Sequence, residues 1–545
     1  MQFKKKQIHS TIALLLIGSG ALGLSSQALA NDSDELEKLR TLVQELDQKV
    51  RVLDRKNELA EEDAAAKKKE TPVVKASKDG FGFESADGKN TIKFRALLQT
   101  DYRDYQQGAN DIRERTDQRA GNIGADGFHD SADTFVLRRA RPIIEGTLFG
   151  KYDYKFTSDF GNGAAVIQDA YVDARFDPAF KVRVGRFKPD LGLERLQGAG
   201  DIKFVERSYV TNNLLPNRDL GIALHGDVLN DKLSYSLGFY NGVADGSSTT
   251  GAAGFLGDKD IGARIFTTPF KGSDSVLAGL GFGIAGTYGD AQGERNLNFT
   301  DTSSADNTRQ GLPSAYLTDG QQVFFRYGTG TVADGSRFRI APQANYYYGP
   351  FGLIAEYTRV EQEVSLAGGG SPGAGGAATN SKIFAGTNKR LSHDAWEIAG
   401  SYLLTGEDAS FKGVKPKRDF DLDKGGWGAW ELVARYSEIN LDSDTFKNSN
   451  GQYAVASSGT TANSAYADLS QSAKTASTWT TGLNWYLSQN VKFQLNYSQT
   501  SFDGGAIAGP SHTAGGAIIN VNAAGSNIKD REDERAVLAR VQFTY

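Results

Sequence analysis

Apolar residues along this chain follow two different repeats, a seven-residue repeat near the beginning and simple alternation over most of the remainder. The seven-residue repeat has charged residues at most positions other than a and d. The a positions are Leu36, Val43, Val50 and Asn57, and the d positions are Leu39, Leu46, Leu53 and Ala60. Such spacing keeps one apolar seam facing a partner helix, so we predict a short N-terminal coiled coil over residues 31–62 and a protein that associates with itself. The alternative is a single amphipathic helix that lies on another surface.

Beyond Gly80, apolar and polar side chains alternate, which is the pattern of β-strands. In residues 92–105 one face of the strand would carry Ile92, Phe94, Ala96, Leu98, Thr100 and Tyr102. The opposite face would carry Lys93, Arg95, Leu97, Gln99, Asp101 and Arg103. The same division recurs in residues 152–160 and 167–176.

Three features favour a membrane barrel over a soluble sandwich for these strands. The alternating segments are about ten residues long, aromatic residues flank them, and tight turns alternate with long polar loops. In a soluble sandwich the apolar faces would meet in a core. In hydrocarbon no strand edge can stay unpaired, so the sheet has to close. We therefore predict an all-β fold over residues 80–545, a transmembrane antiparallel β-barrel of about sixteen strands around a water-filled lumen.

Turns and loops along the predicted barrel differ in length, and we expect the short ones at the periplasmic end and the long ones outside. The expected turns are at residues 86–88, 149–151, 177–179, 230–232, 348–350 and 487–490. The expected long loops are at residues 106–133, 289–320, 367–382, 442–476 and 503–534. The final strand would pair with the first one to close the barrel, with Val537, Ala539, Val541, Phe543 and Tyr545 against lipid and Arg540, Gln542 and Thr544 in the lumen.

Residues 1–30 have the form of an export signal. Three lysines precede an apolar run from Thr11 to Leu24, and Ala28-Leu29-Ala30 supplies small residues for cleavage. An uncleaved membrane anchor is the alternative, although the apolar run is short and contains glycines. Residues 63–79 have no apolar period and contain a proline, so we expect a linker between the coiled coil and the barrel.

Composition and charge exclude several classes of function. Because the chain has no cysteine, it has no disulfide framework, thiolate metal site or thiol nucleophile. A formal net charge of −5 disfavours a nucleic-acid partner, which would require a basic surface. The histidines outside the signal are His129, His225, His393 and His512, and none lies in a recognisable serine or metal-binding arrangement. We therefore expect no enzyme, no cofactor and no metal site.

Several stretches of the predicted barrel resemble one family of outer-membrane channels. They are RRARPIIEGTLFGKYDYKFTSDFG, IQDAYVDARF, VRVGRFKPDLGLERLQGAGDIKFVERS, RDLGIALHG, APQANYYYGPFGLIAEY and WTTGLNWYLSQNVKFQLNY. Together they are similar to the phosphate-selective porins, the O and P type of anion channel. The resemblance covers the whole barrel, and it implies a sixteen-stranded homotrimer in the outer membrane of a Gram-negative bacterium. Each subunit would have its own pore, narrowed by loops that fold inward.

An anion loses water when it enters a constriction, so fixed cations and hydrogen-bond donors have to replace its hydration, preferably as arginine forks. They must also release the anion again. The resemblance implies that the adjacent Arg138 and Arg139 fill this role, since the family keeps such a pair at the start of a strand. Lys93 and Arg95 would project into the same lumen from the first long strand. Glu145 shares a face with Arg139, so a carboxylate could compensate part of this charge.

The stretch GRFKPDLGLERLQ resembles the constriction loop of the family. The resemblance implies that Lys188 and Arg195 line the narrowest part of the pore, and Arg207 matches an arginine that members keep. This chain departs from the phosphate-selecting members at residues 198–200, where it has Gly-Ala-Gly in place of serines and a lysine. It also lacks an evident ladder of closely spaced arginines, since residues 291–320 contain only Arg295 and Arg309.

We therefore expect an outer-membrane porin that passes small anions, phosphate or polyphosphate among them, with its coiled coil in the periplasm. One alternative is a general porin with weak selectivity. Another is a structural or adhesive outer-membrane protein in which the coiled coil is a periplasmic spacer. The heptads alone favour two helices, whereas the resemblance implies trimers; we expect a trimer, because contacts between barrels are far larger than those of a short helix.

Overall fold

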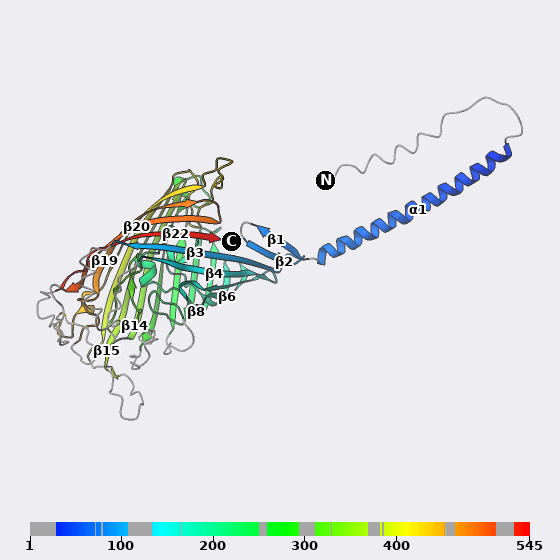
Figure 1. Cartoon of the computed structure of the whole chain (residues 1–545). Helices are drawn as coiled ribbons and strands as arrows, with labels where there is room; N and C mark the ends of the chain where they lie inside the picture. Colours follow the sequence, from blue (N-terminus) through cyan, green and yellow to red (C-terminus); the bar gives the residue numbers. More distant parts are fainter. Residues whose placement is uncertain are drawn as a thin grey trace. The chain divides into compact units, whose positions relative to one another are not determined.

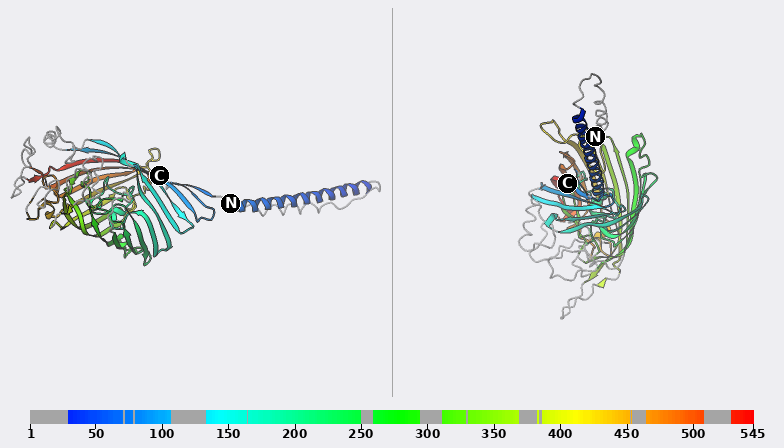
Figure 2. Two further views of the ribbon diagram at one scale, coloured as in Figure 1. Left: turned by 90° about the horizontal axis from the view of Figure 1, so that it is seen from below. Right: turned by 90° about the vertical axis from the view of Figure 1, so that its right-hand side faces the viewer.

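Sixteen antiparallel strands form a closed barrel in the computed structural model of the chain (Figure 1; Figure 2). The structure describes residues 29–70, 72–77, 80–106, 133–163, 165–249, 259–293, 311–328, 330–368, 382–383, 386–451, 453, 464–507 and 528–545. The expected signal peptide over residues 1–30 lies almost wholly outside these ranges.

Each barrel strand pairs with its neighbour along the chain. The first eight are β3 (Thr91–Tyr105), β4 (Thr134–Leu148), β5 (Tyr152–Asp159), β6 (Val166–Asp177), β7 (Phe180–Phe187), β8 (Asp219–Val228), β9 (Leu233–Tyr240) and β10 (Asp260–Thr267). The remaining eight are β11 (Leu280–Gln292), β14 (Thr331–Tyr348), β15 (Phe351–Gly368), β17 (Lys389–Leu403), β18 (Ala429–Asn440), β19 (Ala473–Tyr486), β20 (Val491–Ile507) and β22 (Glu534–Thr544). The final strand β22 pairs with β20 on one side and with β3 on the other, which confirms the predicted closure.

Side chains alternate between the two faces of the wall as the sequence predicts. On β22 the outward Phe543 is 50% exposed, whereas the inward Arg540 is 1% exposed. On β6 the outward Val172 is 47% exposed, and its neighbour Asp173 faces the lumen and is buried. The outer surface is apolar because it meets lipid, and the backbone groups of the wall pair along continuous ladders between adjacent strands, apart from a few bulges.

The predicted tight turns join the strands at one end of the barrel. At the β8–β9 turn, Leu229, Asn230 and Asp231 all have positive φ, as hairpins with strongly twisted turns require. Residues 404–428 also connect two strands, β17 and β18, at this end, and a connection of that length was not predicted. It reaches the lumen, because the side-chain amide of Gln197 donates to the carbonyl of Phe411 at 3.0 Å.

The segment before the barrel forms its own elements. Helix α1 (Leu29–Glu70) includes the predicted coiled-coil region and continues further than expected. Strand β1 (Val73–Ser77) then pairs with β2 (Gly80–Glu84), and β2 pairs with the start of β3. Regular structure therefore occupies most of the expected linker over residues 63–79. No helix within the described residues has the length and apolar character of a membrane span.

Short elements complete the described chain. They are α3 (Leu193–Leu196), the π-helix η2 (Val210–Leu214), the 3₁₀ turns η1 (Gly161–Gly163), η3 (Val276–Gly279) and η5 (Ser443–Phe446), and the short strands β12 (Tyr316–Leu317), β13 (Val323–Phe325), β16 (Lys382–Ile383) and β21 (Ile528–Asp530). Of the predicted long loops, most of residues 106–133, 367–382 and 503–534 lies outside the described residues.

Because the outer face of the wall meets lipid, we expect the cost of an arginine substitution there to depend on its depth in the membrane. An arginine at Val172, in the middle of β6, should lower the free energy of unfolding by about 2–4 kcal/mol, because it would place a charge in hydrocarbon. An arginine at Ile167, which also faces outward but lies at the end of β6, should cost only about 0–1 kcal/mol. Urea titration of V172R and I167R in lipid vesicles measures both values. Equal costs for the two variants would contradict the assignment of this face to lipid.

Candidate functional site

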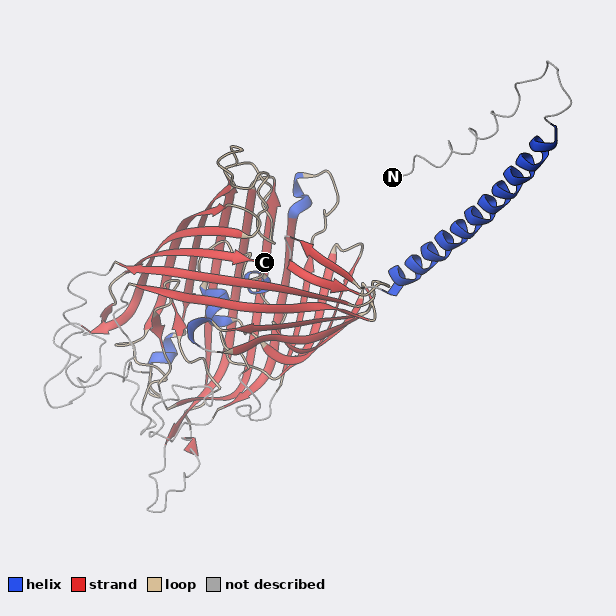
Figure 3. Cartoon of the chain, turned by 45° about the vertical axis from the view of Figure 1, so that its right-hand side comes forward, coloured by secondary structure: helices blue, strands red, loops and turns tan. Residues whose placement is uncertain are grey.

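A long segment between β7 and β8, residues 188–218, folds into the barrel; we call it the constriction loop. It contains α3 and η2, which are among the helical turns in blue in Figure 3. The loop crosses to strands far along the chain. For example, the backbone N–H of Val205 donates to the side chain of Asn496 on β20 at 2.7 Å, and Lys203 pairs with Glu431 on β18 at 2.6 Å.

The tip of the constriction loop has a short Gly-Ala-Gly sequence, residues 198–200, that docks by its main chain. The carbonyl of Ala199 accepts a hydrogen bond from Gln99 at 3.0 Å. The carbonyl of Gly200 accepts from Gln542 at 3.0 Å and from Lys492 at 3.1 Å. A Cβ at Gly200 would lie 3.2 Å from Thr544, so the close approach to β22 favours glycine. The departure from the family pattern at this position therefore has a packing role.

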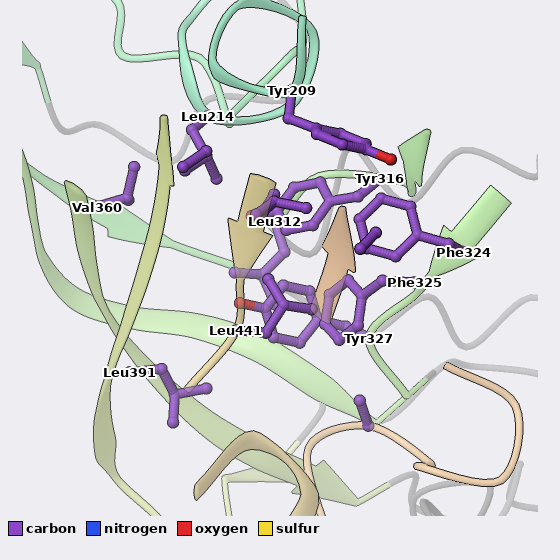
Figure 4. Packing of buried hydrophobic residues seen from close by; sticks show 14 of the residues in the cluster. Tyr209, Leu214, Leu312, Tyr316, Phe324, Phe325, Tyr327, Val360, Leu391 and Leu441 are labelled. Carbon is purple, nitrogen blue, oxygen red and sulfur yellow. The ribbon is translucent and has the colours of Figure 1, made fainter. Parts of the chain in front are cut away.

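A second inward loop, residues 311–328, packs on the constriction loop. Figure 4 shows Tyr209 of the constriction loop beside Tyr316 and Phe324 of the second loop, and the ring centroids of Tyr209 and Phe324 are 5.8 Å apart. The hydroxyl of Thr318 bonds to Glu534 on β22 at 2.9 Å, and Asp319 pairs with Arg435 on β18 at 2.5 Å. The two loops together cover one side of the lumen.

Burial separates the lumen surface into two parts. The inward side chains of β15, β17, β18, β19, β20 and β22 form the filled wall, which lies behind the loops. Examples are Glu356, Glu397, Glu431, Arg435, Thr478, Asn484, Gln494, Asn496 and Arg540, none more than 4% exposed. We call the inward side chains of β4 to β9 the open wall; there Lys155 and Arg175, toward the periplasmic end, are 30% and 45% exposed, whereas Arg139 and Thr157 are buried. We therefore expect water and solutes to pass along the open wall.

Arg138 and Arg139 both reach the lumen because β4 has a bulge. Gln99 of β3 is opposite Arg139, but the next residue, Thr100, is opposite Leu137, so Arg138 is an extra residue in the ladder. A bulge of this kind redirects a side chain that strict alternation would send to the other face. The guanidinium of Arg138 donates to Glu206 of the constriction loop at 2.6 and 3.1 Å, and Arg139 donates to Gln99 at 2.6 Å.

These two residues belong to an arginine cluster that also contains Arg103 and Arg540. Arg103 donates to Glu206 at 3.1 Å, and Arg540 forms a bidentate pair with Asp101 at 2.6 and 2.8 Å. The three guanidinium groups of Arg103, Arg138 and Arg540 thus share two carboxylates. Among the described residues Arg139 has no carboxylate within ion-pair distance, and its Nε has no hydrogen-bond partner. The cluster therefore carries an excess of positive charge beside the passage.

Glu206 is the main compensating group, and sequence reasoning did not find it. Burial alone would raise the pKa of this carboxyl, but the guanidinium of Arg138 lowers it below its usual range. Glu206 is therefore ionised throughout the physiological pH range. It lies 68 residues from Arg138 in the sequence, so no local pattern links them.

The open wall continues with two paired arginines beside the cluster. Arg141 donates to Asp159 at 2.6 Å, and Arg218 donates to Asp169 at 3.2 Å. The sequence predicted that carboxylates could compensate arginines on this face, but it identified neither partner. Arg218 was not predicted as a site residue at all.

Lys93 and Arg95 lie apart from the arginine cluster, toward the periplasmic end of β3. Arg95 pairs with Glu145 at 3.1 Å, and Lys155 approaches the other oxygen of Glu145 at 3.8 Å. Lys93 is opposite Glu145 in the ladder and forms no ion pair within the described chain. Three cations thus surround one carboxylate on the open wall.

Lys188, Arg195 and Arg207, which the sequence analysis expected at the narrowest part of the pore, contact carbonyls of their own loop. The amine of Lys188 donates to the carbonyls of Arg195 and Gln197 at 2.6 and 2.8 Å, and Arg207 donates to the latter carbonyl at 3.0 Å. Arg195 donates to the carbonyls of Thr211 and Leu215. Burial, followed by the charge of Arg207, holds the pKa of Lys188 well below its ordinary value. These three residues therefore stabilise the turns of the constriction loop.

The described histidines have structural partners. His225 lies 3.0 Å from both oxygens of Asp173, and His393 bonds to the hydroxyl of Tyr327 at 2.7 Å. His129 and His512 lie outside the described residues. Within the described chain, no group of three or more histidine, aspartate or glutamate side chains is arranged to hold a metal ion.

The chain was compared with known proteins, and several solved structures are similar to it. Solved structures similar to the chain include OmpT of Vibrio cholerae, with 9% identity, a TM-score of 0.43, and coverage of 84% of this chain and 98% of that one. The outer-membrane channel DcaP of Acinetobacter baumannii has 11% identity, a TM-score of 0.44, and coverage of 85% and 99%. The anion-selective porin from Comamonas acidovorans has 11% identity, a TM-score of 0.42, and coverage of 84% and 100%. No curated protein sequence matches the chain.

The family of phosphate-selective porins O and P matches residues 116–504, which is most of the chain and contains both inward loops and the arginine pair. Membership indicates a channel rather than an enzyme. The chain belongs to the phosphate-selective porin O and P family, and it is an outer-membrane porin that forms a diffusion channel.

Proposed function

We propose that this porin prefers small anions, and that the preference arises mainly at the arginine cluster. The observation that carries the proposal is Arg139, a buried cation beside the passage with a neutral hydrogen-bond partner and no carboxylate. A fixed charge in a narrow, partly desolvated region acts more strongly on a passing ion than the same charge in water. The second group, Lys93 and Arg95 with Lys155, extends the positive potential toward the periplasm.

The arrangement supports fast passage rather than tight binding. Arg138, Arg141 and Arg218 are each held by a carboxylate, so an anion has to compete with Glu206, Asp159 or Asp169 for their donors. Shared donors of this kind attract an anion without trapping it, as conduction requires. Phosphate and polyphosphate match the fork geometry of arginine and are therefore included among the proposed solutes.

A general porin with weak selectivity is the second candidate function. It is favoured by the near balance of charge at the narrow part of the open wall, where Arg141 and Arg218 each face one carboxylate. Arg295 and Arg309, the only arginines in the region where the family has an arginine ladder, lie outside the described residues. A measurement of ion selectivity distinguishes the anion-preferring porin from the general porin.

Two single substitutions should change selectivity in opposite directions. R139Q removes the uncompensated charge and should lower the ratio of anion to cation permeability, whereas E206Q removes a compensating carboxylate and should raise it. One unit charge about 8 Å from the ion gives a change of roughly two- to tenfold, depending on the local dielectric. Reversal potentials in a potassium chloride gradient measure the ratio, and phosphate added to one side tests whether it blocks the chloride current.

The control is R535Q, because Arg535 is exposed on the outer face of β22 and should leave selectivity unchanged. A cation preference in the wild type, or no phosphate block together with equal ratios in R139Q and E206Q, would contradict the proposed anion site and favour the general porin.

We further propose that the protein is a homotrimer and that α1 forms a periplasmic coiled coil. In the single chain the predicted seam of α1 is open to solvent, with Leu39, Val43, Leu46, Val50 and Leu53 between 48% and 61% exposed. Apolar side chains at heptad spacing are stabilised when partner helices cover them. The helices would follow the symmetry of the barrels, whose mutual contact area is much larger.

Crosslinking tests both parts of this proposal. L46E places a charge in the seam and should abolish crosslinks between helices, whereas Q48E, on the outer side of the same helix, should retain them. Both variants should still run as trimers in mild detergent, because the barrels hold the assembly. Crosslinking of the wild type that stops at dimers would contradict the trimer, and unchanged helix crosslinks in L46E would contradict the coiled coil.

A further inference from the structure

Two glutamates of the filled wall are directly opposite each other in neighbouring strands. Glu356 of β15 is the register partner of Glu397 of β17, and both side chains point into the barrel. Glu356 is 4% exposed and Glu397 is 3% exposed. Directly opposed side chains have Cβ atoms about 5 Å apart, so two ionised carboxylates here would repel strongly.

Glu356 holds the constriction loop. Its Oε1 accepts the backbone N–H of Leu193 at 2.6 Å, and its Oε2 accepts the backbone N–H of Glu194 at 2.9 Å. Both oxygens therefore act as acceptors, which suits the ionised form of Glu356. Glu397, by contrast, has an Oε1 without any hydrogen-bond partner, although the atom is buried.

Neither glutamate has an ion-pair partner among the described residues, although the positive charge of Arg435 acts on Glu397 from a distance. On the loop side, Glu194 adds a third carboxylate, which is bonded to Arg435 of β18 and to Ser208. The nearby cations have other partners, and none forms an ion pair with Glu356 or Glu397 in the described chain. Arg435 also binds Asp319, Arg195 binds loop carbonyls, Lys203 binds Glu431, and Arg264 of β10 binds Gln343.

Little water can replace these missing partners. The space between the constriction loop and this part of the wall has a volume of about 20 Å³ and is lined by Glu194, Glu397, Tyr347 and Ser401 among others. That is room for about one water molecule. The hydroxyls of Tyr347 and Ser401 are also without hydrogen-bond partners there. A second negative charge in this enclosed region would be poorly solvated.

We propose that Glu356 and Glu397 share one proton, and that this proton allows Glu356 to hold the constriction loop against the wall. The proton resides mainly on Glu397, because both oxygens of Glu356 accept N–H groups. When the proton is lost to solvent, the dyad carries two opposed charges and the loop is released from Glu356. The two glutamates thus position the constriction loop of the channel. The proposal goes beyond ion preference and does not depend on which ions the pore selects.

The direction of the pH effect follows from proton counting. The attached state binds one proton on the dyad, whereas the same two glutamates, once the loop has left and water reaches them, would bind none near neutral pH. Release of the loop is therefore coupled to loss of one proton, and its equilibrium constant rises about tenfold for each pH unit. The rise continues until the attached dyad itself loses its proton, and buried glutamates can retain theirs to about pH 8–9.

Hydrogen exchange and infrared spectroscopy of the full chain in detergent test this proposal. The protonated carboxyl has its own C=O stretch, which should be present in the wild type at neutral pH and absent from E397Q. The exchange rates of the Leu193 and Glu194 amides, divided by their intrinsic rates, should rise about tenfold per pH unit above neutrality in the wild type. In E397Q, whose neutral amide can donate to Glu356, they should stay slow at all pH values.

Two further variants separate a shared proton from a merely structural role. E356Q loses one acceptor for the loop, so its amides should exchange rapidly at every pH. E438Q, at the outer end of β18, is the control and should behave as the wild type. An infrared band that is unchanged in E397Q, or equal pH profiles in the wild type and E397Q, would overturn the proposal. The infrared comparison remains decisive even if E356Q fails to fold.

Discussion

The structure depends on the pairing of every backbone hydrogen-bonding group within the wall. An unpaired N–H or C=O in hydrocarbon costs several kcal/mol, so a sheet in a membrane has to close on itself. Here closure takes place between β22 and β3, and the inward pair of Arg540 and Asp101 bridges the same two strands. Because the outer face is reserved for apolar side chains, the polar chemistry of the chain has to lie inside.

The inside of the barrel is therefore where loops and charges meet. The constriction loop and the second inward loop satisfy their own polar groups on the filled wall, through contacts such as Lys203 with Glu431 and Asp319 with Arg435. We therefore expect solutes to pass along the open wall. The charge that solutes meet depends on which arginines pair with carboxylates, and Arg139 has no carboxylate partner among the residues that the structure describes.

The sequence predicted those parts of the structure that follow from short-range periodicity. The alternating faces of β3, β6 and β22, the closure of the barrel and most of the turns follow from a period of two residues and from turn chemistry. The predictions for the site were incomplete where contacts between residues far apart in the sequence determine the position of a side chain. The bulge at Arg138 breaks the alternation, and Glu206 joins it from 68 residues away. Lys188, Arg195 and Arg207 were expected at the pore, but carbonyls of their own loop engage them.

Chemical modification of single cysteines tests most directly whether the passage follows the open wall, because the chain has no cysteine of its own. K155C lies on the open wall, F156C on the lipid face of the same strand β5, and N484C on the filled wall behind the loops. A charged, water-soluble thiol reagent should reduce the single-channel conductance of K155C and leave the other two unchanged. A reduction in N484C, or an equal reduction in F156C, would contradict this account of the channel.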